Sequence, residues 1–148
     1  MSLTNPTKKM SKSDSNPKSR ILITDSREEI ARKLRTAVTD AVNSVTYDAK
    51  GRPGVSNLVD MMYYFDESVA GSPEELADDL HSLSMKALKE KVADTVDGGT
   101  RDIRGRYEEL MGGDQKDLVA HAEDGARRAE DIAEGTMERV RDAMGMRW

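Results

Sequence analysis

Lys9-Met10-Ser11-Lys12-Ser13 is the stretch around which the rest of this sequence is organised, and we call it the lysine loop. Pro6 precedes it and Pro17 follows it, so a regular helix cannot run on through either flank. The serines favour turns because their hydroxyls hydrogen-bond to nearby backbone groups. We therefore predict a mobile loop that presents lysine ammonium groups, which are point charges suited to polyphosphate.

Further stretches accompany the lysine loop along the chain, at residues 7–21, 46–48, 52–58, 72–76, 106–110 and 125–129. Together, and in this order, they resemble tryptophanyl-tRNA synthetases, which are class I aminoacyl-tRNA synthetases with a KMSKS signature loop. Ser15 departs from the family, which usually has proline there. The stiffness of the loop is expected to differ for that reason, while both lysines are kept.

The resemblance implies that this sequence is the C-terminal portion of a synthetase of the bacterial and mitochondrial type. In that family a nucleotide-binding Rossmann domain precedes the signature loop, and its His-Ile-Gly-His-type motif has no counterpart here. The expected fold is mainly α, a helical bundle of the anticodon-binding type preceded by the mobile loop, with the Rossmann domain absent. We expect the loop and a connector over residues 1–24 and the helical domain over residues 25–148.

The resemblance also implies roles for the residues of the lysine loop. Lys9 and Lys12 are the expected catalytic residues, which would hold the triphosphate of ATP and stabilise the departing pyrophosphate. The whole set expected to bind ATP is Lys9, Met10, Ser11, Lys12 and Ser13. The Mg²⁺ would arrive with ATP, and no protein ligands for a metal are expected. We expect the 148-residue chain not to form tryptophanyl-adenylate by itself.

The partners implied for the full-length enzyme are tRNA(Trp), tryptophan and a second copy in a homodimer. Residues 80–88 look similar to fungal mitochondrial versions, which favours the mitochondrial matrix, with the bacterial cytoplasm as the alternative. Two other hypotheses remain open. The chain could be a non-catalytic helical module that binds tRNA or a protein, or a gene remnant with an exposed face where a missing domain would dock.

Composition independently favours a helical protein. Charged residues make up 34% of the chain and aromatic residues 4%, which suits a bundle packed by aliphatic side chains. The chain has no cysteine, so disulfides and thiolate metal sites are excluded. The net charge is -5, yet residues 1–20 hold five basic side chains against one acidic. We therefore expect anion binding at the basic N-terminal segment rather than over the whole surface. No apolar run approaches the length of a membrane span, and no signal or transit peptide is visible.

Helix signals are clear in the first half of the chain. Residues 20–24 form either a brief strand or an extended connector. Ser26 begins a capping box with Glu29, and apolar residues every four positions from Ile30 predict a helix ending near Asn43. A turn-rich connection over residues 47–54 precedes a well-buried helix over residues 55–65.

The second half is predicted to contain a short helix followed by longer ones. Ser72 and Pro73 open the short helix, which ends near residues 81–83. A long helix from Ser84 should be interrupted or kinked at Gly98-Gly99 and stop at Gly112-Gly113. Two more helices are expected, over residues 115–122 and 124–144.

Apart from the lysine loop, no group of residues predicts a catalytic site. His81 and His121 lack the spacing of a metal-binding pair and are expected at a helix cap or core edge. The basic face formed by Arg32, Lys33 and Arg35 is expected to be solvated. The residues that bind tRNA stay unassigned, because the candidate arginines lie among acidic neighbours that would pair with them. These candidates are Arg101, Arg104, Arg106, Arg127, Arg128, Arg139 and Arg141.

Overall fold

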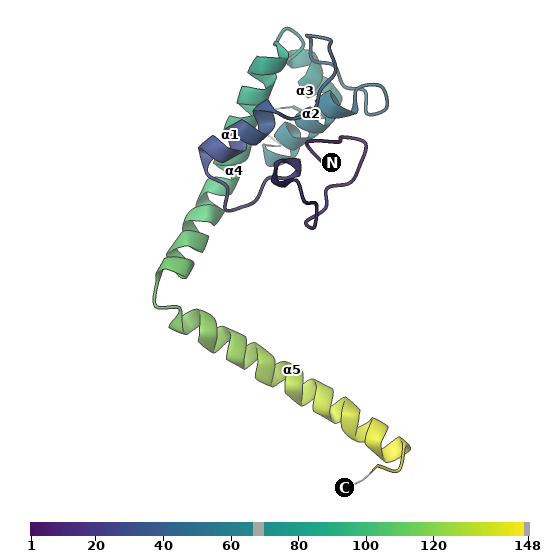
Figure 1. Ribbon diagram of the computed structural model, residues 1–148, viewed down its shortest axis with the longest axis vertical. Coiled ribbons are helices and arrows are strands. Elements are labelled where there is room, and N and C mark those ends of the chain that lie inside the picture. The colour runs from purple at the N-terminus through teal and green to yellow at the C-terminus, as the bar shows by residue number, and fades with distance from the viewer. Residues whose placement is uncertain (67–69, 147–148) are drawn as a thin grey trace. The chain divides into compact units, whose positions relative to one another are not determined.

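The computed structural model describes residues 1–66 and 70–146, and the regular secondary structure of these residues is all helical (Figure 1). In chain order the elements are η1 (Pro17–Ser19), α1 (Arg27–Arg35), α2 (Pro53–Phe65), α3 (Pro73–Asp79), α4 (Met85–Gly112) and α5 (Lys116–Ala143). No strand occurs in the described residues, so residues 20–24 form a connector and not the brief strand that was the alternative. The predicted mainly α fold is confirmed. The chain divides into two compact units, residues 1–105 and residues 106–148.

The first unit holds the hydrophobic core. Figure 1 shows α1, α2 and α3 gathered around the first part of α4. Each helix contributes side chains that are almost fully removed from water: Ile30 and Leu34 from α1, Val55, Leu58 and Val59 from α2, Leu76 from α3, and Leu88, Val92 and Val96 from α4. Burial of this aliphatic set is the main favourable term that holds the unit together.

Local signals fix where the helices begin, as predicted. The Ser26 hydroxyl accepts a hydrogen bond from the Glu29 amide at 3.3 Å, and Glu29 Oε2 accepts one from the Ser26 amide at 3.0 Å. At α3, the Ser72 hydroxyl caps the Glu75 amide at 3.1 Å. These contacts satisfy amides that have no partner inside the helix. The start of α2 differs from the prediction, because the helix begins at Pro53 and not at residue 55, with Pro53 in its first turn.

The prediction that the first helix reaches Asn43 is wrong, because α1 ends at Arg35. The Thr36 hydroxyl bonds back to the Lys33 carbonyl at 3.1 Å, and the Val38 amide donates to the Leu3 carbonyl at 2.8 Å. A contact with the start of the chain therefore replaces the next helical turn. Val38 and Val42, expected on the buried stripe, are about half exposed, at 48% and 54%.

The prediction of a break at Gly98-Gly99 is also wrong, because α4 runs from Met85 to Gly112 without interruption. A Cβ built on Gly99 would lie 2.4 Å from a ring carbon of Phe65. The glycine at this position thus lets the Phe65 ring of α2 lie close to α4, and it does not make a turn. The predicted stop at Gly112 is confirmed.

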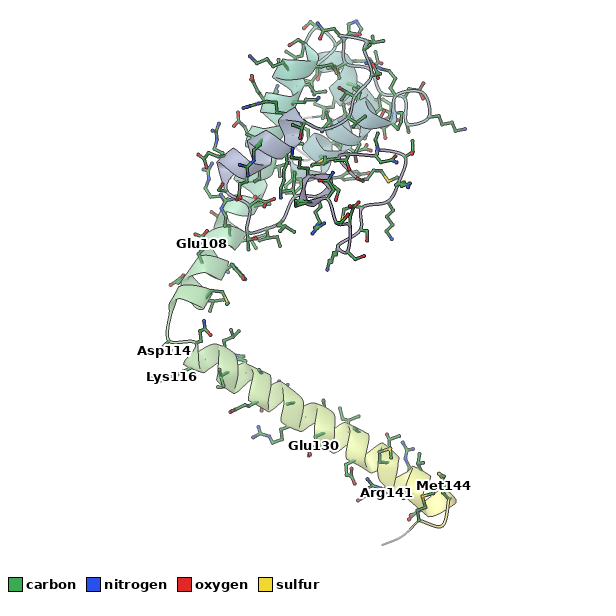
Figure 2. All side chains as sticks on the ribbon, viewed as in Figure 1. Glu108, Asp114, Lys116, Glu130, Arg141 and Met144 are labelled. Carbon is green, nitrogen blue, oxygen red and sulfur yellow. The ribbon has the colours of Figure 1, made fainter. Side chains whose placement is uncertain are left out.

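The second unit is formed by the end of α4 and by α5. The two helices predicted over residues 115–122 and 124–144 are one helix, and Asp124, where the second was expected to begin, forms ion pairs with Arg127 and Arg128 inside it. No residue of α5 is buried. Figure 2 shows Glu130, Arg141 and Met144 along this helix. None of the described helices is both long and apolar enough to cross a membrane.

Candidate functional site

The first three residues close the base of the lysine loop. The Ser2 amide donates to the Lys8 carbonyl at 3.0 Å, and the Leu3 amide donates to the Ser19 carbonyl at 2.9 Å. Ser2 and Leu3 are themselves buried. Residues 9–18 therefore project from two fixed points that the backbone of the first unit holds in place.

The lysines at the tip of the loop are unengaged. Lys9 and Lys12 are both exposed, and within the described residues neither ammonium group has a hydrogen-bond or ion-pair partner. Ser11 and Ser13 share a hydrogen bond of 3.0 Å between their hydroxyls. The Asp14 amide donates to the Ser11 carbonyl at 3.3 Å, which makes a turn around Lys12. Of the two free cations, Lys12 thus lies within a compact turn and Lys9 lies just before it.

Short-range contacts order the second half of the loop. The Asp14 carboxylate accepts from the Asn16 amide at 2.8 Å, and the Asn16 side chain accepts from the Lys18 amide at 3.0 Å. The Arg20 guanidinium donates to the Asp14 carbonyl at 2.9 Å. The only acidic side chain of residues 1–20 is therefore occupied with backbone, and it does not pair with the lysines.

Several other cations of the first unit are committed to the fold. Lys33, expected on a solvated face, is buried and paired with Asp25, so that expectation is wrong. Arg101 and Arg104 bind the two carboxylate oxygens of Asp97 at 2.8 and 2.7 Å. The hydrogen bond from Arg101 is the main cause that lowers the pKa of Asp97 from its ordinary value, and the hydrogen bond from Arg104 is the next. Asp97 therefore stays ionised although it is buried.

Arg52 was not singled out from the sequence, yet it organises the connection from α1 to α2. Its guanidinium donates to both carboxylate oxygens of Asp40 at 2.7 and 2.9 Å. It also donates to the carbonyls of Val42 and Ser44 and to the Thr46 hydroxyl, at 2.7 to 3.0 Å. The hydrogen bond from Arg52 is the main cause that lowers the pKa of Asp40 to about 2. Only the composition of residues 47–54, rich in turn formers, hinted at a structured connection.

The remaining candidate residues are engaged elsewhere. His81 Nδ1 lies 3.0 Å from the Val45 carbonyl, and His121 Nδ1 lies 2.8 Å from the Asp117 carbonyl. No cluster of potential metal ligands occurs in residues 1–66 and 70–146. Of the candidate arginines in the second unit, Arg127, Arg128 and Arg141 are ion-paired on exposed surface. The arrangement assigns none of them to tRNA.

Comparison with known proteins identifies the family of this chain. A family model described as tRNA synthetases class I (W and Y) matches residues 1–98, which include the whole lysine loop and its supporting helices. The chain belongs to this synthetase family. The predicted resemblance is therefore confirmed at the level of the family.

The curated relatives of this synthetase chain are tryptophan–tRNA ligases. Those of Bacillus anthracis and Enterococcus faecalis are 36% and 33% identical over 99% of this chain. The mitochondrial enzyme of Caenorhabditis elegans is 38% identical over 97% of it. The chain spans only 43%, 42% and 38% of these three relatives, and it matches their C-terminal part.

A solved structure supports the fold of this synthetase chain. The crystal structure of tryptophanyl-tRNA synthetase from Mycoplasma pneumoniae aligns with a TM-score of 0.79 and 24% sequence identity. The alignment covers 100% of this chain and 45% of the other. The helical architecture is therefore one that a longer synthetase also contains.

Proposed function

We propose that this chain is the C-terminal part of a tryptophan–tRNA ligase, in which the lysine loop binds the phosphates of ATP during the charging of tRNA(Trp) with tryptophan. The observation that carries the proposal is the pair of exposed ammonium groups of Lys9 and Lys12, which have no partner in the described residues and project from a loop with a fixed base. Membership of the synthetase family supports it.

The chemistry asked of the loop is electrostatic. Activation of an amino acid by ATP releases pyrophosphate, and negative charge develops on the leaving group in the transition state. Lys9 and Lys12 would neutralise that charge, with the Ser11 and Ser13 hydroxyls as additional hydrogen-bond donors. Mg²⁺ would arrive on the phosphates, since this ion is usually held through one or two carboxylates together with the substrate phosphates.

The lysine loop by itself supplies half of such a site. The relatives contain more than half of their length outside the matched region, and we propose that the site for the amino acid lies there. We propose that residues 1–24 act as the loop and connector of the active site and that residues 25–148 form the helical domain. We also propose that the full-length enzyme is a homodimer. We place it in the mitochondrial matrix, with the bacterial cytoplasm as the alternative.

The test is tryptophan-dependent exchange of pyrophosphate into ATP. We expect no exchange by the 148-residue chain alone. We expect exchange by a chimera in which this chain replaces the matched part of the Bacillus subtilis tryptophan–tRNA ligase, which is 34% identical to it. In the chimera, Lys9→Ala with Lys12→Ala should lower kcat by about 10²- to 10³-fold, the scale for losing a stabilising group of a transition state.

Lys50→Ala is the matched control, because Lys50 is an exposed lysine on another loop of the same unit. It should leave the exchange rate unchanged. An unchanged rate in the double lysine variant would refute the proposal for the loop. Salt-dependent binding of tRNA by the isolated chain, with no dependence on ATP, would instead favour the non-catalytic binding module.

A further inference from the structure

A pocket with a volume of about 250 Å³ lies between α1 and the start of α4 in the first unit. Its apolar lining comes from Ala31 of α1 and from Met85 and Ala93 of α4. Pockets for drug-sized ligands are usually larger, at roughly 300–1,000 Å³, so a small molecule is the size of ligand that fits here. No residue of the lysine loop lines the pocket, which makes it a separate site.

Positive charge surrounds this apolar lining. Arg35, Lys86 and Lys89 line the pocket together with a single carboxylate, that of Glu90. Lys86 and Glu90 are 3.9 Å apart with side chains 84% and 67% exposed, and an ion pair in that setting contributes little attraction. Arg35 has no hydrogen-bond or ion-pair partner within residues 1–66 and 70–146. The pocket is therefore suited to a molecule that carries an anionic group.

Lys89 differs from the other two cations because it is partly buried. Its Nζ donates a hydrogen bond of 2.8 Å to the carbonyl of Ala37, a buried residue. Desolvation lowers the pKa of Lys89 from its ordinary value, because burial penalises the charged form. A lysine desolvated in an apolar pocket is an activated nucleophile, since more of it is present as the neutral amine. A neutral amine has two N–H groups, so it keeps the bond to Ala37 and still presents its lone pair.

We propose that this pocket binds small aldehydes that carry a carboxylate, and that Lys89 forms an imine with them. The Lys89 nitrogen attacks the carbonyl carbon. The resulting carbinolamine takes up one proton and loses water, which leaves a protonated imine in which C=N replaces C=O. The remaining N–H of the imine donates to the Ala37 carbonyl, as the ammonium group does in the free protein.

The other residues of the pocket select the aldehyde. The fork of the Arg35 guanidinium, with Lys86 beside it, holds the carboxylate, while Met85 and Ala93 contact the apolar body. The reaction needs neither an oxidant nor a reductant, and it uses no residue of the lysine loop. The inference therefore stands apart from the proposed function.

Trapping with sodium borohydride tests the proposal on the full 148-residue chain. The probe is 4-formylbenzoate, and the matched probe is its methyl ester, which keeps the aldehyde and the ring but loses the charge. Borohydride reduces any imine to a stable secondary amine, which peptide mass spectrometry then locates. We expect Lys89 to carry at least about tenfold more adduct than Lys91, an exposed lysine of the same helix that does not line the pocket.

Charge recognition has its own test. Arg35→Gln with Lys86→Gln should lower the adduct of 4-formylbenzoate at Lys89 to the level that the methyl ester gives. The amount of methyl ester adduct at Lys89 should stay unchanged, because the apolar lining and the Lys89 amine are kept. Lys91→Gln is the control variant and should change neither adduct.

Three results would overturn the proposal. Equal labelling of Lys89 and Lys91 by 4-formylbenzoate would show that Lys89 is an ordinary surface amine. Equal labelling of Lys89 by the acid and by its methyl ester would show that the pocket does not recognise a carboxylate. The same preference for Lys89 in the chain unfolded by urea would assign it to the local sequence and not to the pocket.

Discussion

Two loops of the first unit use positive charge in opposite ways. In the connection between α1 and α2, Arg52 makes five hydrogen bonds, which reach Asp40, two backbone carbonyls and the Thr46 hydroxyl. In the lysine loop, Lys9 and Lys12 make none within the described residues. Arg52 therefore holds its connection together, whereas Lys9 and Lys12 contribute no polar contact to the fold in the described residues.

The difference follows the chemistry of the two side chains. A guanidinium is planar and offers five donors in a fixed fork, so it can join several acceptors at once. An ammonium group on a flexible stem is a poorer brace but adapts to a phosphate chain. We therefore expect substitutions at Arg52 to lower the free energy of unfolding. Substitutions at Lys9 and Lys12 should instead lower exchange activity in the chimera and leave the fold stable.

The largest loss of stability should come from Arg52→Ala. It leaves the Asp40 carboxylate and three other acceptors without their donor, and Arg52 is only 13% exposed at its side chain. We expect a loss of about 2–4 kcal/mol in the free energy of unfolding, measured by urea titration. Lys50→Ala, two residues away, is the control and should change it by less than about 0.5 kcal/mol. Equal effects of the two changes would contradict the role given to Arg52.

A smaller loss should come from Arg52→Lys. The charge next to Asp40 is kept, but one ammonium cannot reach the carboxylate, the Ser44 carbonyl and the Thr46 hydroxyl together. We expect about 1–2 kcal/mol by the same titration. A fully stable lysine variant would show that charge, and not the geometry of the fork, holds this connection.

Acid should weaken the Arg52 loop through Asp40. The pKa of Asp40 falls from 3.8 to about 2 mainly because of the hydrogen bond from Arg52. A depressed carboxyl pKa contributes stability that is complete above about pH 4 and is lost as the pH falls through 2. Asp40→Asn should remove this part of the acid dependence, about 1 kcal/mol after allowance for solvent screening. Identical acid profiles of the two proteins would rule out the contribution.

The smallest effect on stability should be that of Lys9→Ala with Lys12→Ala. Neither side chain contacts a described residue through a polar group, so the free energy of unfolding should change by no more than about 0.5 kcal/mol. The same protein should show the loss of exchange activity predicted above for the chimera. Marked destabilisation by these two changes would mean that the lysines support the fold after all.

Much of the fold could be predicted because its signals are local. The caps at Ser26 and Ser72 and the glycine that ends α4 each act within one helical turn. The errors arose where a distant residue decided the outcome. Leu3 ends α1 through the Val38 amide, and the ring of Phe65 explains the glycine at position 99.

The exposed position of the lysine loop was predictable for similar reasons, while its role in binding ATP stays a prediction. The lysine loop could be read from five adjacent residues, whose exposure the structure confirms. The burial of Lys33 could not be predicted from the sequence, because its partner Asp25 lies before the helix and the folded unit encloses the pair. Arg52 was missed because its acceptors span residues 40–46 and form no pattern until the connection is folded.

The hydrogen bonds from Ser2 and Leu3 that close the base of the lysine loop have one more consequence. With both ends fixed, residues 9–18 behave as an interchangeable insert, whose length and sequence can vary while the helices keep their register. Substitution at Ser15, or grafting of a loop from another synthetase, would then change the loop without any need to redesign the scaffold.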